Sequence, residues 1–290
     1  ILVGLVGSEM CIRDRFVATL FGSFPEMRTF GHRSYQWLLD NNNYDIVIDN
    51  QSISYGMLDI QKIIPFIEII HHPITKDFKH ELEASDKILY RLSRYRWYSF
   101  LGMQKKVAPK IKRIITPSKN SKKDISVDFK CNPNNISVIN NGLDTDIFIP
   151  YTNIERLPYR LITTASADVP LKGLDYTLRA IEKLKKNYVN IELVIIGKLK
   201  KDGHTSRLIK SLQIEDIVSF KTNLTKEEIA IEYSKSSIAI VSSLYEGFGY
   251  PVIEAMSCGV PLIAADTSSI PELVKDCLLY TSDAADELSR

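Results

Sequence analysis

The 290-residue sequence has no apolar run of 18 residues, only four cysteines, and almost no excess of either charge. Without such a run, no segment is apolar over the length that a helix needs to span a bilayer. The cysteines, at positions 11, 131, 258 and 277, form neither a CxxC pair nor a metal-ligand spacing. They indicate free thiols in a reducing compartment, which is the cytoplasm or its membrane face, and they predict no metal site.

Charge and length narrow the class of protein further. Because 37 Lys and Arg oppose 35 Asp and Glu, the net charge of +2 does not favour nucleic acid as a partner. Nine Lys and Arg against two Asp lie between Lys105 and Lys130. This run is a solvated face, which we favour, or a contact for an anionic membrane or acceptor. The length suits two domains of about 150 residues each.

The two ends of the chain differ in character from the rest. The strings VGSEMCIRDR and CLLYTSDAADE resemble translated sequencing-adapter DNA. We therefore interpret residues 1–15 and 277–290 as artefact and exclude them from the fold. The N-terminus also has no basic segment and no small-residue cleavage site, so a signal peptide is not expected.

Short apolar runs alternate with segments of helical period, which predicts βα units and parallel sheets. In the first half the pattern predicts strands over 44–49, 63–70, 113–116 and 137–139, and a long helix over 81–108. In the second half it predicts strands over 161–164, 191–196, 217–220, 238–241 and 261–265, and helices over 173–186, 204–212, 225–234 and 252–257. Polar, turn-prone residues predict a domain boundary near 150.

The loop after the strand over 238–241 carries the most chemical information. Gly247 and Gly249 permit a close approach of the backbone, and Pro251 suits the first turn of the helix that follows. Free amides and the helix dipole at this edge of the sheet favour an anion. Glu246 and Glu254 flank the loop, and either carboxylate could accept hydroxyl groups of a sugar or ribose. Glu254, which we expect in the first turn of that helix, could instead simply complement its N-terminus.

The stretch from Glu246 to Pro261 closely resembles the motif E-G-F-G-x-P-x-x-E-A-M-x-C-G-x-P of family-4, group 1 glycosyltransferases. The resemblance covers about 45–276 and includes the segments 117–118, 141–150 and 171–174, and the strand that ends at His71. It implies an α/β, GT-B fold with two Rossmann-like parallel-sheet domains that face each other across a cleft. The acceptor-side domain would occupy 16–150 and the donor-binding domain 151–276, and both are expected to be truncated.

The family pattern assigns roles to individual residues. It implies that Glu254 holds the donor ribose and that Glu246 lies beside the transferred sugar. Lys172 corresponds to the lysine that neutralises the diphosphate, although a solvated lysine before a helix is the alternative. The backbone amides that would face the sugar and diphosphate are those of Gly247, Phe248 and Gly249.

Two features leave parts of this assignment open. Members of the family usually carry an arginine shortly before the lysine, but segment 164–170 has none. The hydroxyls of Thr164 and Ser166 would replace it, or the phosphate site is weaker, and Asp168 should point away. His71 corresponds to a histidine that faces the cleft and contacts the donor at the reacting centre. His72 should point to the other face of its strand.

The helical segment 91–100 mixes arginines with aromatic residues. We expect it to pack on the first sheet, with its arginines extended to solvent, although contact with an acceptor or a membrane surface is the alternative.

The resemblance implies a retaining, metal-independent glycosyltransferase. It would move a sugar from a nucleoside-diphosphate sugar to a hydroxyl acceptor that the sequence does not identify, and it would need no cofactor. Alternatives are another GT-B protein, such as an epimerase or a phosphorylase, and a non-catalytic sugar-nucleotide binding protein. A NAD dehydrogenase is disfavoured because the sequence has no GxGxxG.

Overall fold

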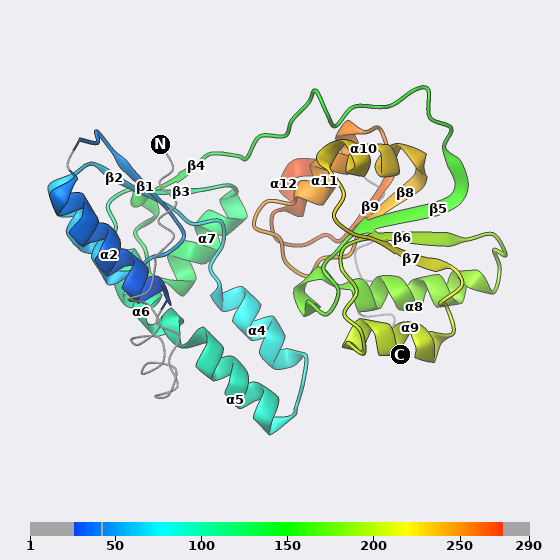
Figure 1. Ribbon diagram of the computed structural model, residues 1–290, viewed down its shortest axis with the longest axis horizontal. Helices are drawn as coiled ribbons and strands as arrows, with labels where there is room; N and C mark the ends of the chain where they lie inside the picture. The colour runs from blue at the N-terminus through cyan, green and yellow to red at the C-terminus, as the bar shows by residue number, and fades with distance from the viewer. Residues whose placement is uncertain (1–25, 42, 275–290) are drawn as a thin grey trace. The chain divides into compact units, whose positions relative to one another are not determined.

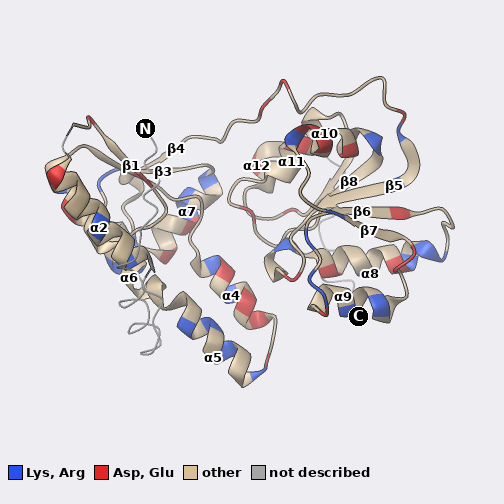
Figure 2. Cartoon of the chain, viewed as in Figure 1, with Lys and Arg blue, Asp and Glu red and all other residues tan. Residues whose placement is uncertain are grey.

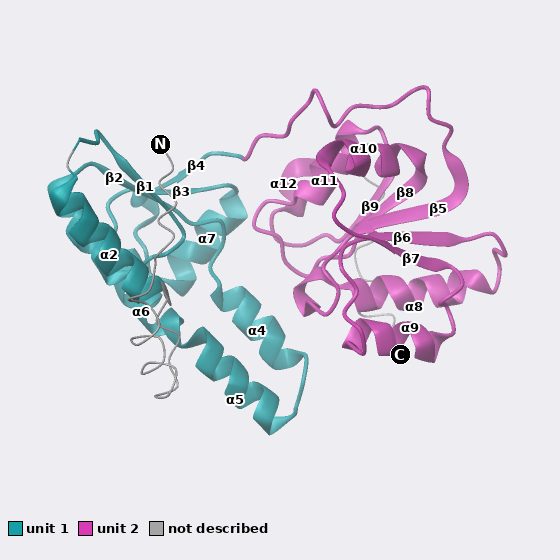
Figure 3. Cartoon of the chain, in the orientation of Figure 1, with its two compact units in different colours: residues 1–140 teal, residues 141–290 magenta. Residues whose placement is uncertain are grey.

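The computed structural model describes residues 26–41 and 43–274, and the chain divides into two compact units between Asn140 and Asn141 (Figure 3). Each unit has its own parallel sheet flanked by helices (Figure 1), as the alternation of apolar runs predicted. The division precedes the expected boundary near 150 because Phe148, only 3% exposed, packs in the core of the second unit. Segments 1–15 and 277–290 lie outside the described residues.

The first unit has four parallel strands in the order β1-β2-β3-β4. The strands are β1 (Val47–Asn50), β2 (Phe66–Ile69), β3 (Ile114–Thr116) and β4 (Ile136–Val138). The α-helices are α2 (Glu26–Asp40), α3 (Tyr55–Ile63), α4 (Thr75–Glu83), α5 (Ile88–Trp97), α6 (Leu101–Val107) and α7 (Lys119–Asp128). Because the strands are parallel and adjacent, their carboxyl ends meet at one edge of the sheet.

The single long helix predicted over 81–108 is wrong, because the structure breaks it into separate helices. The chain leaves α4 after Glu83, and Lys87 has an extended backbone before α5 begins. After α5 a 3-10 turn places the side chains of Tyr98 and Phe100 in a small cluster with Leu101. Burying these side chains redirects the chain, which the helical period of the sequence does not reveal.

Helix α5 also contradicts the expectation that segment 91–100 packs on the sheet. No residue of α5 is buried, and Ile88, Leu89 and Leu92 are 74%, 83% and 60% exposed. Arginines are spaced along the same helix (Figure 2). The burial in this segment belongs to Tyr98 and Phe100, beyond the end of α5. No helix in the described ranges is both long enough and apolar enough to cross a membrane.

The second unit has five parallel strands in the order β7-β6-β5-β8-β9. The strands are β5 (Leu157–Thr164), β6 (Glu192–Ile196), β7 (Val218–Lys221), β8 (Ser236–Val241) and β9 (Leu262–Ala264). The α-helices are α8 (Leu174–Lys185), α9 (His204–Leu212), α10 (Lys226–Lys235), α11 (Tyr250–Ser257) and α12 (Ile270–Val274). The chain builds outward from β5 in one direction and then from β8 in the other, so the strand order reverses between them.

Both faces of this second sheet are buried. Leu161 and Ile162 are adjacent in β5, yet Leu161 packs with α8 and α9 while Ile162 packs with α10, α11 and α12. Successive strand residues point to opposite faces, so a strand covered on both sides needs a continuous apolar run. This explains why the strands of the second half read as unbroken hydrophobic segments in the sequence.

Candidate active site

Two loops meet at the point where the strand order of the second sheet reverses. One follows β5 and the other follows β8, and the amide of Leu244 in the second loop donates to the carbonyl of Leu171 in the first, at 2.8 Å. Gly173 has a φ of +61°, and a Cβ at this position would lie 1.9 Å from the carbonyl oxygen of Ser242. Only glycine allows this approach. Open α/β sheets bind ligands at such a reversal.

The carboxylate of Glu246 lies at this point and is firmly anchored. Its Oε1 accepts hydrogen bonds from Lys172 Nζ and from Ser243 Oγ, each at 2.7 Å, and the residue is 8% exposed. Its backbone amide donates to Ser268 Oγ at 2.8 Å, and its carbonyl accepts from Ser269 Oγ at 2.8 Å. Lys172 is therefore not the solvated lysine of the alternative interpretation, because its ammonium is paired across the two loops.

Helix α11 begins directly after the glycine-rich loop. Gly249 caps it with a φ of +107°, a conformation that side chains rarely adopt, and Pro251 lies in the first turn as the sequence predicted. Ser269 Oγ also lies 2.8 Å from the carbonyl oxygen of Phe248, so its proton can reach either carbonyl of the loop. The loop thus has fixed ends, which keeps the helix N-terminus at the carboxyl edge of β8.

Glu254 lies in the second turn of α11, not the first as the sequence suggested. Its Oε2 lies 3.4 Å from the hydroxyl of Tyr233 on α10, which also lies 2.9 Å from Thr164 Oγ1 at the end of β5. Burial raises the pKa of the Glu254 carboxyl, and the Tyr233 hydrogen bond partly offsets this. The simpler interpretation of Glu254 as a helix-terminus carboxylate loses support, since the dipole acts mainly within the first turn.

In the first unit, His71 follows β2 as predicted and lies beside the end of β1. Its Nε2 is 2.7 Å from Asn50 Oδ1, and its amide donates to Gln51 Oε1 at 2.8 Å. Burial, followed by the charge of His72, lowers the pKa of the His71 imidazole. His72 Nε2 instead lies 2.7 Å from Asp77 Oδ2 on α4. The two histidines therefore contact different elements, and His71 is held in a defined orientation.

The segment that lacks the expected arginine has its own hydrogen bonds. The hydroxyl of Thr164 is directed to Tyr233. The carboxylate of Asp168 accepts from the amide of Thr205 at 2.7 Å, at the start of α9. Asp168 thus caps a helix, which favours its negative charge at that N-terminus.

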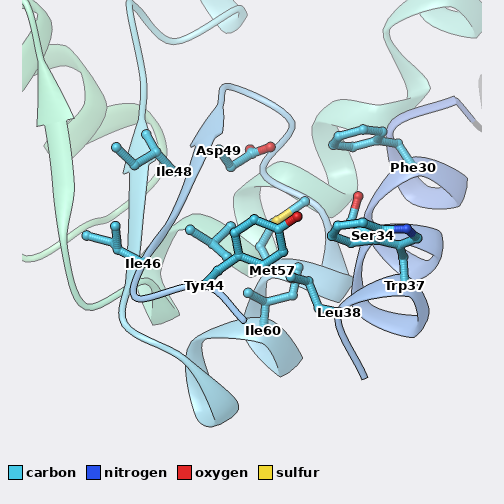
Figure 4. Close-up of a pocket in the computed structure, with 11 residues that line it drawn as sticks. Phe30, Ser34, Trp37, Leu38, Tyr44, Ile46, Ile48, Asp49, Met57 and Ile60 are labelled. Carbon is cyan, nitrogen blue, oxygen red and sulfur yellow. The ribbon is translucent and has the colours of Figure 1, made fainter. Parts of the chain in front are cut away.

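A pocket in the first unit is lined mostly by apolar side chains and by none of these site residues (Figure 4). Trp37 and Tyr44 line it with ring centroids 5.6 Å apart, and Asp49 is also among its lining residues. It has no lysine or arginine among its lining residues, so it lacks the cations that a diphosphate requires. Within the described ranges, no group of three or more His, Cys, Asp or Glu is placed to hold a metal ion.

The sequence analysis assigned no role in this site to several residues that shape it. Ser243, Ser268 and Ser269 fasten the loop around Glu246, and Tyr233 contacts Glu254. The serines follow β8 and β9, so their position at strand ends was a usable signal. Tyr233 lies inside a helix and is 1% exposed. Nothing in its local sequence distinguishes it from a core residue.

Two family profiles match the chain. The profile described as "Glycosyl transferases group 1" matches residues 153–288, and "Glycosyltransferase Family 4" matches residues 8–147. The MMP alpha-(1->4)-mannosyltransferase of Mycolicibacterium hassiacum is 38% identical over 282 residues, covering 95% of this chain and 68% of that protein. Further glycosyltransferase relatives are matched over 44% and 41% of their lengths.

Solved structures resemble the fold across both units. Sucrose-phosphate synthase from Thermosynechococcus elongatus aligns with a TM-score of 0.66 at 18% identity, covering 84% of this chain and 61% of that one. HepE of Anabaena in complex with UDP-glucose aligns with a TM-score of 0.65 at 16% identity, covering 94% of this chain and 72% of that one. At these identities the likeness establishes the fold alone.

Proposed function

The chain belongs to the group 1 glycosyltransferases of family 4, and we propose that it transfers a sugar from a nucleoside-diphosphate sugar to a hydroxyl acceptor with retention at the anomeric carbon. Its fold is GT-B, with two Rossmann-like parallel-sheet units. One observation carries the proposal: Lys172 and Glu246 meet at the reversal of strand order, where this fold binds ligands. The UDP-glucose in the HepE structure supports a nucleotide-sugar donor.

We assign the donor to the edge formed by the β5 and β8 loops. The Lys172 ammonium and the amides of Gly247, Phe248 and Gly249 would face the diphosphate and sugar, and Glu254 would accept the ribose hydroxyls. Glu246 would contact the transferred sugar, and the role that the family pattern implies for His71 stays a prediction. A cation and a helix N-terminus stabilise a departing diphosphate in the way a metal ion otherwise does. The proposal therefore requires neither a metal nor a cofactor.

For retention we propose a front-face route. The bond from the anomeric carbon to the diphosphate oxygen breaks, and its electron pair leaves with the diphosphate. The acceptor oxygen bonds to the same face of that carbon and passes its proton to the departing phosphate. A double displacement would instead need a carboxylate nucleophile on the acceptor side, and the sequence motifs assign none there.

The test is transfer from UDP-, GDP- and ADP-hexoses to a panel of hydroxyl acceptors, with the anomer of the product assigned by NMR. We expect a product with the anomeric configuration of the donor, at a rate that EDTA does not change. An inverted product would contradict retention, and EDTA-sensitive transfer would contradict metal independence.

One alternative is a non-catalytic sugar-nucleotide binding protein, which the missing arginine in segment 164–170 favours. Donor binding without transfer or donor hydrolysis would support it. A phosphorylase would instead carry the absorbance of pyridoxal phosphate.

We also propose peripheral contact of α5 with an anionic membrane surface at the cytoplasmic side. The exposed Leu89 and Leu92 lie on the same helix as Arg91 and Arg96, and apolar side chains flanked by arginines suit a lipid interface. The free thiols of Cys131 and Cys258 are consistent with a reducing compartment.

Sedimentation with phosphatidylserine vesicles tests this contact. We expect Leu89→Ser/Leu92→Ser to reduce the bound fraction several-fold. Val189→Ser, which removes an 89% exposed side chain from the second unit, should leave the bound fraction unchanged. A wild-type chain that stays in the supernatant at low salt would refute the contact.

A further inference from the structure

We propose that Tyr233 is a positioning residue for the donor site, and that its hydroxyl orients the Glu254 carboxylate that receives the donor. The inference rests on the proposed function, because it assigns Tyr233 a role only through the role of Glu254. It adds to the site a side chain from α10, an element to which neither the motif nor the family pattern assigned a functional residue.

The hydroxyl of Tyr233 lies where three elements converge. It is 2.9 Å from Thr164 Oγ1 at the end of β5, 3.4 Å from the carbonyl oxygen of Pro251, and 3.4 Å from Glu254 Oε2. Thr164 ends the strand at which the sheet order reverses, and Pro251 lies in the first turn of α11. One hydroxyl therefore links the strand edge, the helix start and the carboxylate.

The burial of Tyr233 separates the role of its ring from that of its hydroxyl. The side chain is 1% exposed and packs with Val252 and Ala255 in the core of the second unit. A phenylalanine ring would fill the same volume, so packing alone does not call for tyrosine. A buried hydroxyl is costly unless it is hydrogen-bonded. Its contacts with Thr164 and Glu254 meet that requirement and give the hydroxyl a direction.

The proton arrangement follows from the chemistry of the three groups. Burial, and next the negative charge of Glu254, raise the pKa of the Tyr233 hydroxyl well above its ordinary value, so it retains its single proton. A carboxylate and a carbonyl oxygen can only accept, so that proton is directed to Glu254 or Pro251 on α11. Thr164 in turn donates to the tyrosine oxygen. The result is a relay that restricts rotation of the carboxylate before a ligand arrives.

The first experiment compares Tyr233→Phe with Tyr151→Phe, a matched control. Tyr151 packs against the same core, but its hydroxyl contacts the carbonyl of Ile147. Calorimetry with UDP, GDP and ADP on the 290-residue chain should show three- to tenfold weaker binding in Tyr233→Phe, about the effect of one hydrogen bond. The control should bind like the wild type. Equal binding by Tyr233→Phe and the wild type would overturn the proposal.

A double-mutant cycle separates positioning from general stability. If Tyr233 acts through Glu254, adding Tyr233→Phe to Glu254→Gln should cause much less further loss than it causes in the wild type. Fully additive losses would refute the positioning role. Thr164→Ser should preserve binding and Thr164→Val should weaken it, which tests the relay even if Tyr233→Phe lowers the melting temperature.

The pH dependence of binding gives a readout that a purely structural role would not move. The ionisable groups that act on Glu254 are Tyr233 and Lys226 of α10, and Glu254 in turn acts on Cys258. Among the other elements near Glu254, helix α12 has one charged residue, Glu272, and strands β8 and β9 have none. Loss of the tyrosine donor should raise the pKa of Glu254. Binding should then fail at a higher pH on the acidic side, and an unmoved midpoint would count against the proposal.

Failure of the inference and failure of the proposed function give different results. If Glu254→Gln binds all three diphosphates like the wild type, the assignment of Glu254 to the donor is wrong. The proposed donor site and the role of Tyr233 are then both refuted. If Glu254→Gln weakens binding while Tyr233→Phe does not, only the role of Tyr233 is refuted.

Discussion

Lys172 and Glu246 form a 2.7 Å ion pair. Each partner neutralises the other, and a diphosphate would compete with the carboxylate for the ammonium. Ser243 donates to the same oxygen of Glu246, so the carboxylate keeps one partner if Lys172 turns to the ligand. The pair therefore allows the two side chains to serve different parts of one donor.

We predict that substitutions at these two positions separate binding from transfer. Lys172→Ala should weaken both the free nucleoside diphosphate and the full donor, and should also slow transfer because negative charge grows on the leaving group. Glu246→Gln should preserve diphosphate binding and impair transfer. Calorimetry and initial rates measure the two effects. Diphosphate binding that is lost in Glu246→Gln but retained in Lys172→Ala would reverse the assignment.

A second prediction concerns Glu68, which is fully buried and lies opposite Asp49 in the β1–β2 register. Burial, followed by the charge of Asp49, raises the pKa of Glu68 well above its ordinary value. The folded state therefore binds this proton more tightly than the unfolded state, and stability falls as the pH rises from the ordinary pKa towards the raised one.

Glu68→Gln removes this ionisation. At pH 8 the free energy of unfolding of the variant should therefore exceed that of the wild type by about 1–3 kcal/mol. The difference should vanish near pH 4. Urea unfolding at several pH values measures it, with Glu83→Gln, an exposed glutamate of α4, as the control. A constant difference across this range would contradict the assignment of the proton to Glu68.

At the scale of elements, the turn between β5 and α8 determines where Lys172 lies. A 3-10 turn over Pro170–Lys172 ends at Gly173, whose positive φ starts α8. The position of the Lys172 ammonium thus depends on the backbone conformation of the residue directly before α8.

We predict that Gly173→Ala destabilises the chain by more than about 1 kcal/mol, because alanine is strained at this φ and its Cβ would meet the Ser242 carbonyl. Diphosphate binding should weaken as well, since Lys172 must move. Gly102→Ala in α6 is the control, because a Cβ there meets nothing within 4 Å and alanine favours helix. Thermal melts and calorimetry measure both, and a Gly173→Ala variant as stable as the wild type would show that the turn can relax.

At the scale of the whole molecule, the two units have separate cores. All of the proposed diphosphate contacts lie in residues 157–274. A ligand stabilises only the part of a protein whose folding creates its site.

We therefore predict that scanning calorimetry resolves two transitions and that nucleoside diphosphate shifts only one. At a ligand concentration of 100 times Kd the stabilisation should be about 2.7 kcal/mol. The transition that the ligand shifts should be the one whose midpoint temperature Gly173→Ala lowers. Glu68→Gln should change the midpoint temperature of the other transition. A single transition whose midpoint temperature rises when ligand is added would mean that the two units unfold together.

Local signals in the sequence were enough to predict the class of fold and the position of the glycine-rich loop. Short apolar runs predicted the strands of parallel sheets, and the glycines and Pro251 predicted the start of α11, because these signals are local. The helical period did not reveal the break between α4 and α5, and the pattern missed α2, α3 and α7. In α2 and α7, polar residues dilute the helical period.

Tertiary structure alone decided which side chains meet. Lys172 and Glu246 are 74 residues apart and Tyr233 and Thr164 are 69 apart, so no local pattern could pair them. The order β7-β6-β5-β8-β9 brings the loops after β5 and β8 together, and strand order is a property of packing between distant segments. The sequence thus supplied the chemical groups and their local geometry. The fold selected their partners, because hydrogen bonds and ion pairs depend on proximity in space.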